Sequence, residues 1–135
     1  MVKKKIVEAL AKIDDQTNLA GRFLNENRID EALYFIWLAA ENLVNTLKIA
    51  INRFYVKDHR EKSLILKEYY VLGYLNRDYS ELFERLAKFR IAAEFHPYTS
   101  IPKSYTKDDV LNYLKQIEEL REEVIKYLKK RGLIK

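Results

Sequence analysis

The chain contains almost no residues that favour tight turns. Only three glycines and two prolines occur among its 135 residues, whereas 48% of residues are hydrophobic and 33% are charged. This composition suits long helices joined by few turns, and it does not suit a β-sandwich, which needs frequent glycine or proline turns. The length fits one domain with its own core. We therefore expect residues 1–135 to form a single all-α domain.

Apolar residues recur at helical spacing in five segments of the chain. The segments are residues 3–25, 30–55, 63–76, 78–96 and 107–131. The third is the least regular, because its aromatic run YYVLGY suits a strand as well as a helix. This order of segments predicts an up-and-down bundle of five helices.

Several residues mark where helices begin and end. Asp78 and Glu81 have the spacing of a capping box, in which an acceptor precedes the helix and a glutamate follows three residues later. Pro97 ends that helix, because the residue before a proline disfavours the helical conformation. We expect Thr106 to cap the last helix and Gly132 to stop it.

The second segment carries two apolar faces. Its main face consists of Leu33, Ile36, Trp37, Ala40, Leu43, Val44, Leu47, Ile51 and Phe54. Its other face, mostly apolar or small, consists of Phe35, Leu38, Ala39, Asn42, Thr46 and Ile49. A helix with two such faces is central in a bundle, or is shared between a bundle and a partner. We therefore expect a central second helix and a homodimer.

The residue types exclude several kinds of site. The chain has no cysteine, and its two histidines, His59 and His96, are too few for a histidine-rich metal cluster. We expect neither a metal nor a cofactor. Residues 33–51 are long enough to span a membrane, but they contain Glu41 and Lys48, and lipid penalises such charges. The charged N-terminal segment is unlike a secretory signal. We expect a cytoplasmic protein without a membrane partner.

The net charge of +5 is concentrated at the two ends of the chain. Residues 3–5 contribute three positive charges, and residues 129–135 contribute four. Between Arg53 and Arg90, nine basic residues face six acidic ones. This pattern is compatible with a polyanionic partner, but on charge alone it favours solvated helix ends and a solvated loop.

The fourth segment places an arginine among its apolar residues. At about 100° per residue, with Leu86 at zero, Leu82 and Phe83 lie at about −40° and +60° on the core-facing side. Arg90 falls at about +40°, between Leu86 and Phe83. A buried guanidinium without a partner is costly, so Arg90 needs an acceptor.

Two neighbours of Arg90 fit that need in different ways. Glu94, four residues on, would form a helix ion pair and make Arg90 purely structural. His96 belongs at the helix C-terminus, since Pro97 follows it, and there the frayed backbone lets its ring swing toward Arg90. The ion pair explains Arg90 but leaves His96 unexplained.

The run RIAAEFH, from Arg90 to His96, resembles the R-x(4–6)-H motif of HEPN domains, which are small helical bundles. The polar turn NENRID and the helix DEALYFIWLAAENLVNTLK are similar to the first two helices of that family. The motif lies late in the fourth helix, where the family places it. The resemblance covers about residues 3–131 and implies a HEPN-like bundle over the single domain.

Many HEPN domains are metal-independent ribonucleases that act as dimers, with both copies of the motif lining one cleft. The resemblance implies that Arg90 clamps a phosphate of RNA and that His96 is the general acid or base. Glu41 and Asn42, midway along the second helix, could supply an acceptor for either residue. The alternative is that they are an exposed glutamate and an amide at the edge of the core.

HEPN toxins paired with minimal nucleotidyltransferases carry R-x(4)-H-x-Y, and the partner attaches AMP to the tyrosine. His96 and Tyr98 match the H-x-Y part, so the resemblance marks Tyr98 for modification beside the cleft. Here five residues separate arginine from histidine, and Pro97 replaces the usual polar residue. Three functions stay open: an RNA-cleaving toxin or defence nuclease, a non-catalytic HEPN subunit that binds a nucleotidyltransferase or nucleotides, and a helical assembly protein without a site.

Overall fold

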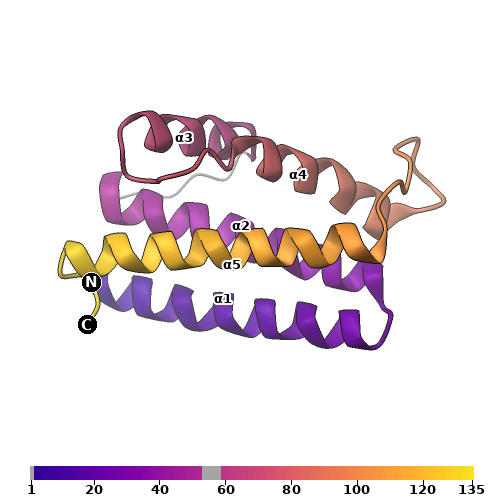
Figure 1. Ribbon diagram of the computed structural model, residues 1–135, viewed down its shortest axis with the longest axis horizontal. Coiled ribbons are helices and arrows are strands. Elements are labelled where there is room, and N and C mark those ends of the chain that lie inside the picture. The colour runs from indigo at the N-terminus through magenta and orange to yellow at the C-terminus, as the bar shows by residue number, and fades with distance from the viewer. Residues whose placement is uncertain (1, 53–58) are drawn as a thin grey trace.

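The computed structural model describes residues 2–52 and 59–135, and all regular secondary structure in them is helical. The helices are α1 (Val2–Asn25), α2 (Ile29–Asn52), α3 (His59–Val71), α4 (Ser80–Phe95) and α5 (Lys107–Lys130). Figure 1 shows the four long helices lying along one axis, with both chain termini at the same end of the bundle. The prediction of an all-α bundle of five helices is confirmed.

The helix α2 is the centre of the bundle, and it packs against each of the other four helices. Its predicted main face is buried from Leu33 to Leu47, while Ile51 is half-buried and Phe54 lies outside the described residues. On its second face Ala39 and Thr46 are buried, and the remaining residues are half-buried. None of the described helices combines the length and apolar character needed to cross a membrane.

The helix α3 differs from the prediction at both ends. It spans His59–Val71, whereas the sequence indicated residues 63–76. Gly73 has a φ of +85°, a left-handed conformation that ends the helix. The N–H groups of Gly73 and Tyr74 donate back to carbonyls of the last turn, as in a Schellman motif. The aromatic run is therefore a helix end and its cap, not a strand.

The capping box predicted at Asp78 is wrong, whereas the cap of α5 is confirmed. Tyr79 is the N-cap residue of α4 and makes no side-chain capping bond. Asp78 instead accepts a hydrogen bond of 2.9 Å from the N–H of Ser80, two residues on, which forms a local turn. Hydrogen bonding to Ser80 holds the pKa of Asp78 below its usual value. Thr106 and Asp109 form the reciprocal box at the start of α5.

Four buried tyrosines predict a loss of stability at alkaline pH. Burial, the main cause in each case, raises the pKa of Tyr69, Tyr79, Tyr105 and Tyr113 above the usual value of 10.0. The unfolded chain releases these protons from about pH 10. Stability is therefore full below that pH and falls as the pH rises above it. The urea concentration at the midpoint of unfolding should therefore fall as the pH is raised above about 10.

The variant Tyr105→Phe should show a shallower fall than the wild type, because it removes one of the four phenols whose pKa is raised. Tyr98→Phe is the matched control, since Tyr98 is 92% exposed and should leave the fall unchanged. A midpoint that does not change above pH 10, or an equal fall in Tyr105→Phe and the wild type, would contradict this assignment.

Candidate active site at the end of α4

Arg90 lies on the core-facing side of α4. The neighbouring positions on that side, Phe83 and Leu86, are buried, and Arg90 is half-buried. The guanidinium carbon of Arg90 lies 5.0 Å from the centre of the Trp37 ring. Helical periodicity accounts for this position, because Arg90 follows Phe83 by about two turns.

Trp37 forms a platform beneath the guanidinium. It belongs to α2 and is 3% exposed, and its ring centre lies 4.9 Å from that of Phe83 in α4. Two helices thus fix the ring over which Arg90 lies. A cation over a tryptophan face gains about 0.5–1 kcal/mol at exposed sites and about 2 kcal/mol when it is desolvated. Stacking and packing hold the guanidinium in place.

The Nε atom of Arg90 is buried and has no hydrogen-bond partner. Within the part of the chain that the structure describes, no other buried side-chain nitrogen or oxygen is in this state. An unpaired buried donor costs roughly 1–3 kcal/mol, so this atom opposes folding. The ion pair with Glu94 that the spacing allowed is not formed, and Glu94 is exposed. A purely structural role for Arg90 through Glu94 is thereby excluded.

His96 lies at the C-terminus of α4, as the sequence indicated. It is the C-cap residue, and its backbone N–H donates to the carbonyl of Ala92 at 3.0 Å. Its φ of −58° and ψ of 134° turn the chain out of the helix before Pro97. The side chain is exposed, and no hydrogen bond joins it to Arg90. The two residues therefore share one end of α4 without a hydrogen bond between their side chains.

Tyr98 lies in the loop 96–106, two residues beyond His96. Its side chain is 92% exposed, and Phe95, at the last position of α4, is 50% exposed. The phenol of Tyr98 is therefore reachable from solvent.

Glu41 and Asn42 are bonded to other partners than Arg90 and His96. The carboxylate of Glu41 pairs at 2.9 Å with Lys62, an ammonium group that is only 3% exposed. The amide of Asn42 donates to Gln16 of α1 at 2.9 Å. Both bonds tie α2 to its neighbours, and within this chain neither side chain supplies an acceptor to the candidate site.

Two hollows flank α4, and neither is lined by Arg90 or His96. The one on the α2 side has a volume of about 290 Å³ and is lined by Asp30, Glu31, Tyr34, Phe35, Ala93 and Glu94. Asp30 pairs with Lys103, and Glu31 pairs with Arg28, so two of its three carboxylates are neutralised. A phosphate approaching Arg90 from this side would therefore meet mainly the charge of Glu94.

Comparison of the sequence with models of known protein families and with curated proteins gives no match. Among the described residues, no group of three or more histidine, cysteine, aspartate or glutamate side chains is arranged to hold a metal ion.

Sequence reasoning missed the partner of Arg90. Trp37 was expected to be an ordinary core residue on the main face of the second helix. A signal was present, because a cation placed in an apolar stripe without an adjacent carboxylate needs an aromatic face or a ligand. Periodicity in one helix cannot say which ring of another helix will meet it, and only the packing of α4 on α2 shows this.

The unpaired Nε predicts that Arg90 is not needed for stability. Arg90→Met removes the buried donor and retains a flexible apolar chain over Trp37, where sulfur also contacts aromatic rings favourably. We expect the free energy of unfolding to rise by about 1 kcal/mol. Chemical denaturation measures this, with the exposed Lys88→Met on the same helix as control. Destabilisation by more than about 1 kcal/mol relative to that control would mean that Arg90 has a structural role.

Proposed function

We propose that this protein is a metal-independent ribonuclease of the HEPN kind, acting as a toxin or defence component, with Arg90 and His96 as its catalytic residues. The observation that carries the proposal is the buried Nε of Arg90, which no protein acceptor satisfies. A guanidinium held by stacking alone can turn toward a phosphate. A hydrogen bond from its Nε–H to a phosphate oxygen would then remove the free-energy cost of the unpaired donor.

The chemistry needs one group that moves a proton and one that stabilises charge. The 2′-oxygen of RNA attacks the adjacent phosphorus, so that the O2′–P bond forms and the P–O5′ bond breaks. His96 takes the proton of the 2′-hydroxyl, and a second donor, His96 of the partner subunit or water, protonates the leaving 5′-oxygen. Arg90 stabilises the negative charge on the non-bridging oxygens of the phosphate.

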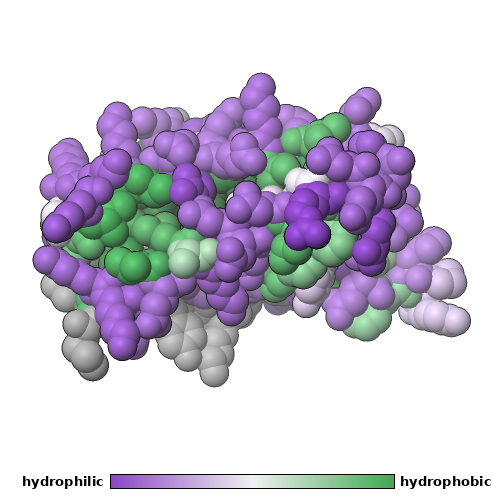
Figure 2. All heavy atoms as spheres, turned by 90° about the horizontal axis from the view of Figure 1, so that it is seen from below, coloured by the Kyte–Doolittle hydropathy of each residue, from purple (hydrophilic) through white to green (hydrophobic). Residues whose placement is uncertain are grey.

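A homodimer is part of the proposal, because it would bring two copies of the motif to one cleft. The central position of α2 accounts for both of its apolar faces within one chain. Support for a second copy comes instead from apolar side chains left open to water near the candidate site. Phe95, the last residue of α4, is 50% exposed, and Phe35, which lines the hollow beside Ala93, is half-buried. Figure 2 shows two further areas of apolar surface, separated by polar residues, on the α1 side of the bundle, which lies opposite α4 in Figure 1 and is therefore not the surface next to the candidate site.

Light scattering should therefore give twice the chain mass of 16.2 kDa at micromolar concentration. Phe95→Ser should shift this equilibrium toward the monomer, whereas Leu111→Ser, which replaces an exposed leucine on α5, should not. A monomer across the micromolar range would count against a shared cleft.

Cleavage of single-stranded RNA in the presence of EDTA tests the activity. Arg90→Ala should lower the rate by about 10²–10³-fold, because it removes the charge that stabilises the transition state. His96→Ala should lower it by about 10²–10⁴-fold. Lys88→Ala on the exposed side of α4 and His59→Ala, which replaces the other histidine, are the matched controls. Activity that EDTA abolishes and a metal ion restores would overturn the mechanism.

A non-catalytic HEPN subunit is the second candidate function. The observation that favours it is the absence of a hydrogen bond between Arg90 and His96, together with the exposure of the His96 side chain. Such a subunit would bind a nucleotidyltransferase or a nucleotide without cutting RNA. Binding that persists in a protein without any cleavage would identify it.

Tyr98 extends the proposal to regulation by a minimal nucleotidyltransferase. Its hydroxyl oxygen would attack the α-phosphate of ATP, forming a tyrosyl–AMP bond and releasing pyrophosphate. The exposure of 92% leaves the hydroxyl accessible to such an enzyme. The phosphate of the attached AMP would compete with RNA for Arg90, and the bulk of the AMP would block the access of RNA to the site.

Coexpression with a minimal nucleotidyltransferase should add AMP to the peptide that contains Tyr98, and the modified protein should lose cleavage activity. Tyr98→Phe should carry no adduct and stay active, and Tyr70→Phe, at another exposed tyrosine, should behave as the wild type. An adduct that persists in Tyr98→Phe would show that another residue is modified.

A further inference from the structure

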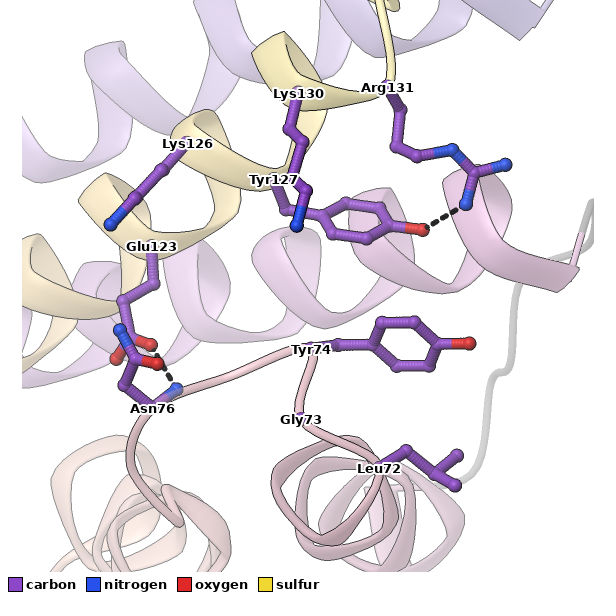
Figure 3. Close-up of a pocket in the computed structure, with 9 residues that line it drawn as sticks. All are labelled: Leu72, Gly73, Tyr74, Asn76, Glu123, Lys126, Tyr127, Lys130 and Arg131. Carbon is purple, nitrogen blue, oxygen red and sulfur yellow. Dashed lines mark hydrogen bonds between the residues drawn. The ribbon is translucent and has the colours of Figure 1, made fainter.

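A cavity of about 520 Å³ opens between the turn after α3 and the last turn of α5. Figure 3 shows Tyr74 on the turn and Tyr127 on α5 with their rings one above the other, and Lys130 extending beside them. The cavity lies at the end of the bundle that holds both termini, away from the loop 96–106 (Figure 1). Its volume is in the range of small-molecule sites, about 300–1,000 Å³.

Two glycines end the helices that flank this cavity, and one of them, Gly73, also lines it. Gly73, with a φ of +85°, lets the N–H of Tyr74 donate to the carbonyl of Tyr69 at 2.9 Å, which folds the Tyr74 ring back toward the bundle. Gly132, with a φ of +70°, ends α5 in the same way directly after Arg131. Helix-ending signals in the sequence therefore fix the cavity.

The floor of the cavity is aromatic. The Tyr74 ring meets Tyr69 and Tyr127 edge-on, each with ring centres 5.5 Å apart. The hydroxyl of Tyr69 donates to Asn52 at 2.5 Å, which anchors the group to α2. Leu72, 58% exposed, adds an apolar wall. A planar ring can pack against these surfaces.

The α5 side of the cavity is basic. Lys126 and Lys130 are four residues apart on one face of the helix, an arrangement of like charges that destabilises a helix unless an anion is present. Neither lysine forms an ion pair within the described residues. Arg131 donates one N–H to the hydroxyl of Tyr127 at 2.9 Å, which positions its guanidinium and leaves further donors.

The one carboxylate in the cavity wall is already engaged. Glu123 accepts hydrogen bonds of 2.5 Å from the backbone N–H of Asn76 and from the hydroxyl of Tyr79. Three cations and one carboxylate give the wall a net charge of +2. An anion entering the cavity is therefore attracted, and the bonds to Glu123 limit its repulsion.

We infer that this cavity binds a nucleotide, with its phosphate on Lys126, Lys130 and Arg131 and its base against Tyr74 and Leu72. A phosphate suits two ammonium groups and a guanidinium, and a planar base suits the aromatic floor. The inference does not depend on ribonuclease activity, because none of these residues belongs to the site at the end of α4.

Cations at the C-terminus of a helix also offset its dipole, and this is the competing explanation of the basic residues. Lys129 separates the two explanations. It lies in the same last turn of α5 and is exposed, but it does not line the cavity. If the lysines only offset the helix dipole, replacing Lys129 or Lys130 should have the same effect. If the cavity binds a nucleotide, Lys130 should contribute to binding and Lys129 should not.

Calorimetric titration of the full chain with AMP tests the inference. Wild type should bind AMP saturably, and Lys126→Gln/Lys130→Gln should bind it about tenfold more weakly or worse. Lys129→Gln should bind as the wild type. Inorganic phosphate and adenosine should each bind more weakly than AMP, because each fills half of the site. In NMR spectra AMP should shift the amide signal of Gly73 and leave that of Gly21 in α1 unchanged.

Titration with a hexamer of deoxyadenosine distinguishes a free nucleotide from one unit of a strand, and this DNA lacks the 2′-hydroxyl that cleavage requires. Tighter binding than AMP through the same two lysines would identify a strand as the source, and weaker binding would identify a free nucleotide. Absence of AMP binding, or equal affinity in wild type and Lys126→Gln/Lys130→Gln, would overturn the inference.

Discussion

The bundle depends on burying α2 from every side, because all four other helices pack on it. Its main apolar face is withdrawn from water between Leu33 and Leu47. Burial of apolar surface contributes roughly 25 cal/mol per Å², so a helix that is covered all round contributes a large share of the folding free energy. Polar groups that pack against such a helix need hydrogen-bond partners inside the bundle. A buried polar atom without such a partner therefore requires an explanation.

Lys62, which is buried, and Arg90, which is half-buried, show how differently the fold treats its cations. Lys62 is almost fully buried, and its ammonium reaches Glu41 of α2 at 2.9 Å, so its charge is compensated. Arg90 lies over Trp37 on the same central helix, yet its buried Nε has no acceptor. One fold thus contains a cation with a structural partner and one without. The unpaired donor is the feature that an external phosphate would explain.

The two ends of the bundle share one combination of residues. At the end with the loop 96–106, one guanidinium stacks on a tryptophan, and His96 and Tyr98 are exposed nearby. At the other end, several cations surround an aromatic cavity between two glycine-capped helix ends. Each end joins positive charge to aromatic surface, the combination that single-stranded nucleic acids and nucleotides favour.

Sequence patterns predicted the elements of the fold better than they predicted contacts between elements. Apolar periodicity and the cap at Thr106 located the long helices, because both depend on residues close together in the chain. The capping pattern at Asp78 failed, since its carboxylate bonds the N–H of Ser80 in a turn instead. The predicted C-terminal end of α3 was wrong because the left-handed conformation of Gly73 ends the helix earlier.

The candidate site was predicted only in part, for a related reason. The wheel position of Arg90 and the helix-end position of His96 are properties of one helix. The tryptophan beneath Arg90 and the cavity beside α5 arise where helices distant in sequence meet, and no periodicity encodes these meetings. The partner of Glu41 could not be predicted from periodicity either, because Lys62 belongs to a different helix, α3.

The central claim is that Arg90 keeps a buried donor free for a phosphate, and NMR of the arginine side chains tests it most directly. In the free protein the Nε–H of Arg90 should exchange slowly with water because it is buried. Addition of a single-stranded DNA oligonucleotide, which lacks the 2′-hydroxyl, should shift this signal while that of the exposed Arg85 stays in place. An Arg90 signal that saturating oligonucleotide leaves unchanged would contradict the claim.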